Sequence, residues 1–347
     1  MLKKILAATI VCASFISVSA QTDSTKKATT TFTGSVDGYY RYNFADPSGK
    51  TNNFTSFTNS QSSFELGMAS VKIDHSVGKV SATADLGFGK RAQEFSYNDA
   101  STLVAVKQLT ISYALSDKFK LTMGKWATHV GYELLDAYAN RNYSMSYGFS
   151  YGPFFHTGLK ADISLGGKSA LMLGVANPTD YSTTTSGNKV ALAQFSTASK
   201  SDKFKLYLNY QGGVTGSKAG FNQIDLVLNG VLSSQFSINY DGTIATVKTN
   251  NVSKNWSSNA LYLNYDPTSC FGLTLRGEYF DDKKSVSAGA FGSSVFATTL
   301  TANIKIDNLT IMPELRLDNG SNPIFFKGTG AATTGTTGFI LAAVYKF

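Results

Sequence analysis

The C-terminal stretch, residues 336–347, constrains the fold of this chain more than any other segment. Its sequence, TTGFILAAVYKF, has one parity that is apolar throughout and aromatic at both ends: Phe339, Leu341, Ala343, Tyr345 and Phe347. A tilted β-strand of about 11 residues is long enough to cross a bilayer. Aromatic rings at both ends of one face are typical of strands in transmembrane barrels. The alternative, an edge strand of a soluble β-sandwich, is not excluded by this stretch alone.

The other end of the chain predicts an exported protein. Residues 1–20 have the pattern of a secretory signal: Lys3 and Lys4, an apolar region at 5–16, and the small residues VSA at 18–20 as a cleavage site. Cys12 does not predict a lipid anchor, because Val11 stands where the attachment motif has a small residue. Cleavage would lower the net charge from +8 to +6, since two lysines and no acids are removed.

Composition excludes several classes of protein. Only Cys270 remains after the signal, so an intrachain disulfide cannot form. No later segment is long and apolar enough for an inner-membrane helix. Charged residues make up 16% of the chain, below the roughly 25% usual in soluble domains. The lysines and arginines form no cluster, so nucleic acid is not expected as a partner.

The spacing of the strands favours a barrel. Residues 21–31 read as a flexible periplasmic lead-in, and from Phe32 onward the dominant period is two. Short connections are predicted at 75–78, 116–118, 165–167, 200–202, 232–234, 266–269 and 307–308. Long connections alternate with them, at 45–62, 90–101, 127–153, 178–188, 212–221, 241–256, 281–292 and 319–335. This rhythm is typical of an up-and-down antiparallel outer-membrane barrel. We therefore expect residues 32–347 to form one all-β transmembrane barrel of about sixteen strands.

The alternation also assigns the two faces of the wall. The aromatic and aliphatic parity is expected to face lipid and the polar parity to face a water-containing lumen. The expected lumen wall carries charges of both signs: Asp37, Arg41, Glu65, Asp85, Lys160, Asp162, Lys205, Asp225, Arg276, Glu278, Glu314 and Arg316. Six of these form three reachable pairs two residues apart on one strand, so some are expected to brace the wall as ion pairs: Lys160/Asp162, Arg276/Glu278 and Glu314/Arg316. Pro313 predicts a β-bulge, because it removes a ladder hydrogen bond.

Two long segments carry a resemblance to a known family. The pieces are FELGM at 64–68, DLGFG at 85–89, GKW at 124–126, NRNYS at 140–144 and GPFFHTG at 152–158. With their surroundings these resemble the OmpL-like family of β-barrel outer-membrane porins (beta-barrel porin-2). The resemblance implies passive diffusion of small solutes across the outer membrane. A final strand ending in Phe347 also resembles the signature that the outer-membrane assembly machinery recognises.

The longest connection, 127–153, is the candidate pore constriction. It carries Glu133, Asp136 and Arg141 among several aromatic residues. Charges on a loop that folds into the lumen act strongly on a passing solute, because the low-dielectric wall focuses their field. The alternative is an extracellular loop packed on its own aromatics. Lys90, Arg91 and Glu94 could form a charged mouth, or simply a solvated loop.

No pattern predicts catalysis. The three histidines, His75, His129 and His156, lack metal-ligand spacing, so neither a metal nor a cofactor is expected. The segment 156–158 is faintly similar to the catalytic histidine segment of outer-membrane phospholipase, but Gly158 stands where the serine should follow. We therefore do not expect an enzyme.

Three functions stay in competition at this stage. The first is a porin that passes small hydrophilic solutes through a water-filled barrel. The second is a loop-filled structural or adhesive barrel without an open pore, and the third is a carrier of hydrophobic solutes, which the polar inner parity disfavours. The expected partners are outer-membrane lipid, the solutes and the assembly machinery at Phe347. A homo-oligomer would use the same outward apolar face as lipid, so oligomeric state is left open.

Overall fold

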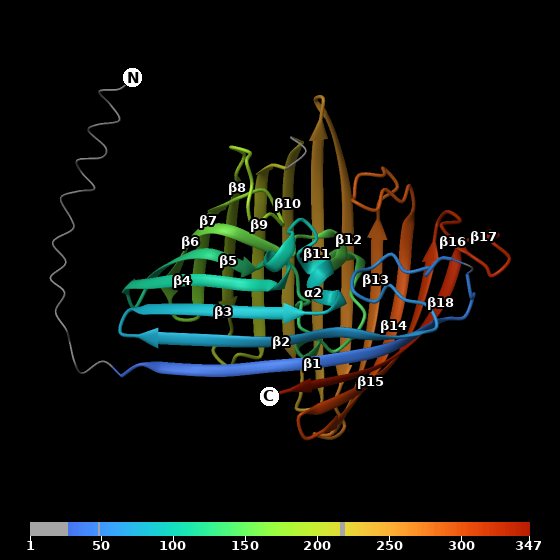
Figure 1. Ribbon diagram of the computed structural model, residues 1–347, viewed down its shortest axis with the longest axis horizontal. Coiled ribbons are helices and arrows are strands. Elements are labelled where there is room, and N and C mark those ends of the chain that lie inside the picture. The colour runs from blue at the N-terminus through green and yellow to red at the C-terminus, as the bar shows by residue number, and fades with distance from the viewer. Residues whose placement is uncertain (1–26, 48, 216–218) are drawn as a thin grey trace.

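The computed structural model describes residues 27–47, 49–215 and 219–347 as a closed antiparallel barrel of sixteen strands (Figure 1). Each strand pairs with its sequence neighbour, and β1 pairs with β18 to close the wall. The remaining pair, β16 and β17, forms a small hairpin outside the barrel sheet. The expected signal segment at 1–20 lies outside the described residues. None of the helices within the described ranges is long and apolar enough to cross a membrane.

The strands of the barrel and its hairpin are β1 Thr29–Asn43, β2 Ser63–Val77, β3 Val80–Phe88, β4 Val106–Ser116, β5 Phe119–Ala127, β6 Phe155–Gly166, β7 Ser169–Ala176, β8 Val190–Ala198, β9 Phe204–Val214, β10 Gly220–Val231, β11 Phe236–Thr249, β12 Val252–Tyr265, β13 Phe271–Asp281, β14 Ser294–Ile306, β15 Leu309–Gly320, β16 Phe325–Phe326, β17 Ala332–Thr333 and β18 Gly335–Lys346. The short helices, all in connections, are α2 Lys90–Phe95, η1 Ser101–Ala105, η2 Ala137–Ala139 and α3 Tyr147–Tyr151.

The last strand closes the barrel with its apolar face outward, as predicted. Val36 lies opposite Tyr345 and Tyr40 opposite Leu341, so the apolar parities of β1 and β18 share the outer face. Phe347 and Gly34 exchange two backbone hydrogen bonds of 2.9 Å, which extend the ladder to the end of the chain. β1 begins at Thr29, so its first residues belong to the wall rather than to a lead-in that ends at 31.

The alternation of long and short connections holds around the barrel, with two exceptions. The connection expected at 212–221 is shorter than predicted, because β9 continues to Val214 and β10 begins opposite it at Gly220. The prediction of a long loop at 241–256 is wrong, because β11 and β12 continue through these residues and meet at Asn250 and Asn251. Both asparagines have positive φ, 50° and 63°, and asparagine tolerates the left-handed region better than most residues. The polar residues that resemble a loop in the sequence therefore belong to a long hairpin, the tall pair in Figure 1.

The bulge expected at Pro313 is also not formed. Thr301 pairs with Glu314 and Ile304 with Ile311, so the β14–β15 register is the same on both sides of the proline. On its other side, Pro313 stays in register with Leu341. The proline interrupts one ladder locally without inserting a residue.

The two faces of the wall separate as predicted. Outward residues such as Leu275, Leu300 and Leu341 are 40–46% exposed, and together they form a continuous apolar belt. Inward charges such as Arg276 and Glu314 are almost completely buried, at 0% and 2%. In this part of the barrel the inner face is covered by protein, which a polar parity alone does not reveal.

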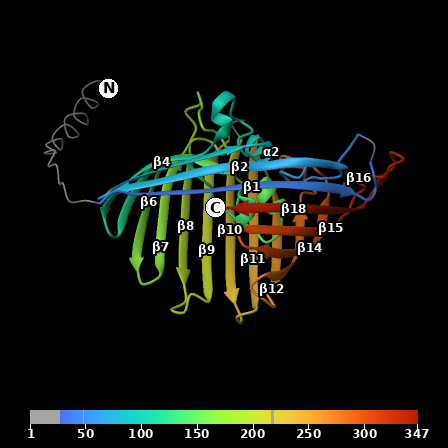
Figure 2. The same cartoon turned by 60° about the horizontal axis from the view of Figure 1, so that its bottom comes forward.

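Three connections fill the half of the lumen that carries the long loops (Figure 2). They are residues 44–62, the segment with α2, and the loop between β5 and β6, here called the inward loop (residues 128–154). A buried apolar cluster joins all three to the wall: Phe57, Met68, Ala92, Phe95, Leu135, Met145, Phe149, Phe154 and Phe155. The inward loop is therefore held inside the barrel by a core of its own.

Candidate pore constriction

The inward loop leaves the wall after Ala127 and returns to it at Phe155. Its last turn, α3, is capped by Ser146, whose hydroxyl accepts a 3.0 Å hydrogen bond from the amide of Phe149. Such a cap satisfies a backbone donor that would otherwise be orphaned in a buried position. The loop thus reaches the lumen as an ordered segment that can present fixed side chains.

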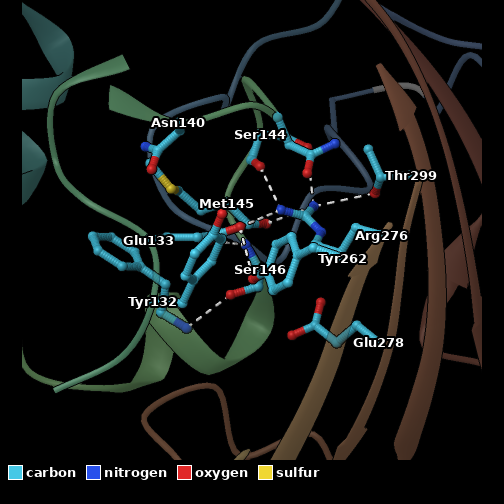
Figure 3. Close-up of polar contacts among 12 residues, drawn as sticks. Tyr132, Glu133, Asn140, Ser144, Met145, Ser146, Tyr262, Arg276, Glu278 and Thr299 are labelled. Atoms are coloured by element: carbon cyan, nitrogen blue, oxygen red, sulfur yellow. Dashed lines mark hydrogen bonds and ion pairs between the residues drawn. The ribbon is translucent and has the colours of Figure 1, made fainter. Parts of the chain in front are cut away.

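Glu133 forms the central contact between the inward loop and the wall. Its Oε1 accepts a 2.6 Å charge-assisted hydrogen bond from Arg276 Nη1 on β13 and a 3.1 Å bond from the Tyr262 hydroxyl on β12. Its Oε2 accepts from the amide of Ser146 at 2.7 Å, further along the same loop. Figure 3 shows the arginine and the glutamate pointing toward one another between strand and loop. The ion pair is buried on both sides, at 0% and 3% side-chain exposure.

Arg276 also binds the backbone of the inward loop. Its guanidinium donates to the carbonyl of Ser144 at 2.8 Å and to that of Met145 at 3.4 Å. A further bond of 3.1 Å reaches Thr299 on β14. A planar guanidinium offers several fixed donors, so this one residue ties two strands to the loop.

Acidic residues of the wall hold the loop by its backbone amides. Glu314 on β15 accepts from the amides of Tyr143 and Ser144, at 2.8 and 3.1 Å. Glu278 on β13 accepts from the amide of Gly148 at 3.0 Å. These contacts explain why two of the three expected in-strand ion pairs, Arg276/Glu278 and Glu314/Arg316, are replaced: the loop supplies better placed partners.

Arg316 and the Lys160/Asp162 pair are wall charges that differ in their surroundings. Arg316 pairs with Asp318 at 2.9 Å and donates to the carbonyl of Met145 at 2.7 Å. Lys160 and Asp162 form the expected in-strand pair at 3.1 Å, and both keep part of their surface exposed.

The other predicted wall residues meet inward segments to different degrees. Arg41 donates to two carbonyls of the 44–62 connection, at 2.5 and 2.9 Å. Asp37 accepts a 2.6 Å bond from the hydroxyl of Tyr143. Asp225 accepts from the amide of Gly131 at 3.0 Å. The remaining predicted positions are the half-buried Glu65 and the exposed Lys205.

The three predicted constriction residues all enter the lumen, but at separate places. Asp136 is bound by Lys107 at 2.6 Å, and the same lysine reaches Asp85 at 3.0 Å. Arg141 forms a two-pronged pair with Asp266, at 2.7 and 3.0 Å, in the short β12–β13 turn. The inward loop therefore extends to the short-turn end of the barrel, and its charges do not form one ring.

The charged mouth expected from α2 is not formed by Arg91. Its side chain is fully buried, 5.0 Å from the ring of Phe57 and 4.9 Å from that of Tyr143. Glu94 accepts from the amide of Phe57 at 2.8 Å and holds the 44–62 connection in place. Lys90 alone of the three stays exposed.

The opposite edge of the inward loop lies against amide side chains, which the sequence reasoning did not single out, and against the buried carboxylates of Asp225 and Asp241. Gln194 donates to the carbonyl of His129 at 3.1 Å, and Asn239 donates to the hydroxyl of Tyr132 at 3.0 Å. Asp241 accepts from the amide of Tyr132 at 3.0 Å. Among the described residues no ion pair crosses this boundary, here called the amide seam (residues 129–132 against β8–β11). The inward parity of these strands, rich in Asn and Gln, is the signal that could have indicated it.

A cavity of about 410 Å³ opens above the amide seam, at the end with the long loops. Its floor includes Gln211, which donates to Gln223 at 2.7 Å. At its side, Asp180 accepts from the hydroxyl of Tyr97 at 3.0 Å. Burial raises the pKa of Asp180 to about 6, and burial together with this carboxylate raises the pKa of Tyr97.

The half of the lumen toward the short turns is more open. Lys72 and Asp74 pair at 3.0 Å with side chains 36% and 42% exposed, and Lys120 is 50% exposed. These residues lie on the inward parity of β2 and β5. Exposed charges thus lie on the short-turn side of the inward loop, and the cavity lies on its long-loop side.

Comparisons with known proteins agree with this architecture. The family model "Putative beta-barrel porin-2, OmpL-like" matches residues 29–347. A sequence comparison with curated proteins finds no significant match. Among solved structures, the outer membrane channel DcaP of Acinetobacter baumannii is similar with a TM-score of 0.61 and 11% identity, over 92% of this chain and 97% of that one.

Two further structures are similar over 92% of this chain. The loop L8 deletion mutant of OmpT from Vibrio cholerae has a TM-score of 0.63 and 12% identity, over 99% of its length. An anion-selective porin from Comamonas acidovorans has a TM-score of 0.62 and 11% identity, over its whole length. At these identities the likeness concerns the fold.

Proposed function

Because this chain belongs to the OmpL-like beta-barrel porin-2 family, and is thus an outer-membrane channel protein, we propose that it passes small hydrophilic solutes by passive diffusion along the amide seam. The observation that carries this proposal is the difference between the two edges of the inward loop. One edge is fixed to β13–β15 by a buried ion pair and further charged side chains. The other contacts β8–β11 through hydrogen bonds, two of them to buried carboxylates, and has no ion pair among the described residues.

The magnitudes favour the seam as the route. A hydrogen bond can be exchanged for water at a net cost of about 1 kcal/mol, because water supplies replacement donors and acceptors. Breaking a buried ion pair costs roughly 3–5 kcal/mol, because each ion is left without a partner. A solute with its own hydroxyl or amide groups would replace seam contacts more easily than it would displace Glu133 from Arg276. In this proposal the seam joins the cavity at the long-loop end to the exposed charges at the short-turn end.

Glu133, Asp136 and Arg141 have a supporting role in this proposal. They hold the inward loop in place and so fix the width of the seam, while wall charges such as Lys160 and Asp162 face the chamber beyond it. We thus propose that the predicted constriction narrows the lumen through the position of the inward loop. Its three charged residues act by holding the loop in that position.

Single-channel recording in planar bilayers tests the proposal. Refolded protein should give small discrete conductance steps. Asn239→Ala, which removes the seam contact to the Tyr132 hydroxyl, should increase them. Asn303→Ala removes a similarly buried asparagine that contacts the loop on the ion-paired side, so it is the control and should leave the step size unchanged. Larger steps in the control than in Asn239→Ala would place the route elsewhere.

A loop-filled barrel without a pore is the second candidate, favoured by the buried cluster that joins the inward loop, α2 and the 44–62 connection. Absence of any conductance from protein that is fully folded by circular dichroism and resists unfolding in the gel would support this candidate. The recording therefore decides between the two functions.

The remaining partners are also proposals. The outward apolar belt suits outer-membrane lipid, and the same surface could join copies of the chain, as in the OmpT structure described as a trimer form. Phe347 is 53% exposed beside the β1 edge, where the assembly machinery could bind it before the barrel closes. Crosslinking in native membranes, with and without Phe347, tests both.

A further inference from the structure

We propose that the cavity above the amide seam is a binding site for neutral saccharides. The inference deepens the proposed function, since the site would collect the solute at the entrance of the route, and it rests on that function for its biological meaning. Binding itself can be measured without any conduction, so the two ideas can fail separately.

Aromatic rings dominate the walls of the cavity. They come from five separate stretches of the chain: Tyr97, Tyr151, Tyr181, Phe221 and Trp256. An aromatic face offers a flat apolar surface with negative charge density, which suits the C–H-bearing face of a sugar ring. Tyr97 is 57% exposed, so part of this aromatic surface is open to a ligand.

The walls are rigid before any ligand arrives. The hydroxyl of Tyr151 donates to the carbonyl of Phe54 at 2.6 Å, and its ring stacks on Phe280 with centroids 5.3 Å apart. The hydroxyl of Tyr97 is held by Asp180. Rings that are already fixed lose little conformational entropy on binding, which favours affinity.

The described lining of the cavity carries little charge. Among the lining residues that the structure describes, Asp180 is the single charged one. One of its oxygens accepts from the amides of Phe154 and Phe155, at 2.7 and 3.0 Å, and the other accepts from Tyr97. This carboxylate is therefore engaged with the protein, and none of the described residues that line the cavity is a cation that could receive an anion.

Polar side chains lie at the floor of the cavity: Thr179 is partly exposed, and its partner Gln211 is fully buried. Gln211 donates to Gln223 and accepts a 3.0 Å bond from Thr179, and these bonds use one of its two N–H groups. Hydroxyl groups of a sugar can both donate and accept, so they can replace such amide contacts one by one. Neutral rings, a fixed frame and an amide floor together select a neutral, hydroxyl-rich ligand, and a volume of about 410 Å³ lies within the usual range of small-ligand sites.

The test uses the refolded full-length protein in detergent, with maltose, sucrose and lactose as neutral probes and glucuronate as the charged comparison. The chain has two tryptophans, so a Trp126→Phe background leaves Trp256 in the cavity as the fluorescent reporter. Isothermal titration of the unmodified protein serves as the second measurement. We expect saturable binding of at least one disaccharide and weaker binding of glucuronate.

Removing a ring should weaken this binding. Tyr181→Ala and Phe221→Ala each delete one aromatic wall, and the loss should be about two- to tenfold in affinity. Tyr138→Ala is the matched control, because Tyr138 lies near Lys346 at the other end of the barrel and should bind as the parent does. Lack of binding by all three disaccharides, or equal affinity in the parent and both cavity variants, would overturn the proposal. Conductance without saccharide binding would contradict the binding site and leave the proposed channel standing. Saccharide binding without conductance would support the binding site and contradict the channel.

Discussion

The contact between Glu133 and Arg276 gives the sharpest test of how the inward loop is held. In Arg276→Met the guanidinium is replaced by an uncharged side chain that can fill part of its space. Glu133, at 3% side-chain exposure, then keeps its charge without a cation, and the carbonyl of Ser144 loses a donor. Removal of one member of a buried ion pair costs roughly 3–5 kcal/mol.

This cost falls on the docked state of the loop, because an undocked loop exposes Glu133 to water. A change of 3–5 kcal/mol would raise the undocked population by about two to three and a half orders of magnitude, at 1.4 kcal/mol per factor of ten. Glu314 and Arg316 still bind the loop backbone, so the barrel itself should stay folded.

Trypsin reports the undocked population directly. Arg141 is the single lysine or arginine between residues 128 and 154, so cleavage within the inward loop occurs at one bond. When docking is fast relative to cleavage, the cleavage rate follows the open population. We expect Arg276→Met to be cut after Arg141 at least a hundredfold faster than the parent. Cleavage at the exposed Lys283 should not change and serves as the internal standard.

A double-mutant cycle separates the ion pair from general damage. Glu133→Gln added to Arg276→Met removes the unpaired charge, so the double variant should be cut at least about tenfold more slowly than Arg276→Met alone. If the effects of the two substitutions simply add, or if Arg276→Met is cleaved as slowly as the parent, the ion pair does not hold the loop.

Three other regions of the barrel give independent predictions. Leu275→Arg places a charge on the lipid face near the middle of β13 and should cost about 2–4 kcal/mol in unfolding from lipid vesicles, whereas Leu275→Ile should cost much less. At the β11–β12 turn, Asn251→Gly should be neutral or stabilising and Asn251→Val should destabilise by roughly 1–2 kcal/mol, because φ is 63° there; a denaturant midpoint that does not distinguish the two would contradict the turn. The third concerns Asp180, whose folded pKa of about 6 lies above its ordinary value of 3.8 because it is buried. The folded state therefore holds this proton more tightly, its contribution to stability is complete below about pH 4, and up to roughly 3 kcal/mol is lost as the pH rises through about 6. Denaturation from pH 4 to 7 should show this loss in the parent and not in Asp180→Asn.

The wall of the barrel could be predicted from the sequence because its determinants are local. In β18 the alternation of Leu341 and Tyr345 with Ala342 and Val344 assigns each residue to a face without any knowledge of its partner strand. The β11–β12 hairpin shows where this reasoning fails. Its strands run past the apolar belt, so their polar residues resemble a loop, and only the geometry at Asn250 and Asn251 marks the turn.

The contacts of the lumen could not be predicted in the same way. The sequence places Glu278 two residues from Arg276, which suggests an in-strand pair. In the folded barrel Arg276 binds Glu133, 143 residues away, and Glu278 binds a loop amide. The choice depends on how deeply the inward loop enters, and that depth is set by the buried apolar cluster around Phe57, Phe149 and Phe154. Pairing of charges in a lumen is thus a consequence of apolar packing.

This dependence determines how the channel can respond to change. Apolar packing and ion pairs both hold the inward loop, so a perturbation must overcome both before the loop undocks. Among the described residues the amide seam has no ion pair; its contacts are separate hydrogen bonds such as that from Gln194 to His129, and such a bond can exchange with water or solute independently. A small solute therefore does not require the loop to undock, whereas a solute too large for the seam does. Substitutions on the two edges should consequently have different effects. Those at the seam should alter conductance without exposing Arg141 to trypsin, whereas those at Arg276 should alter conductance and also expose Arg141.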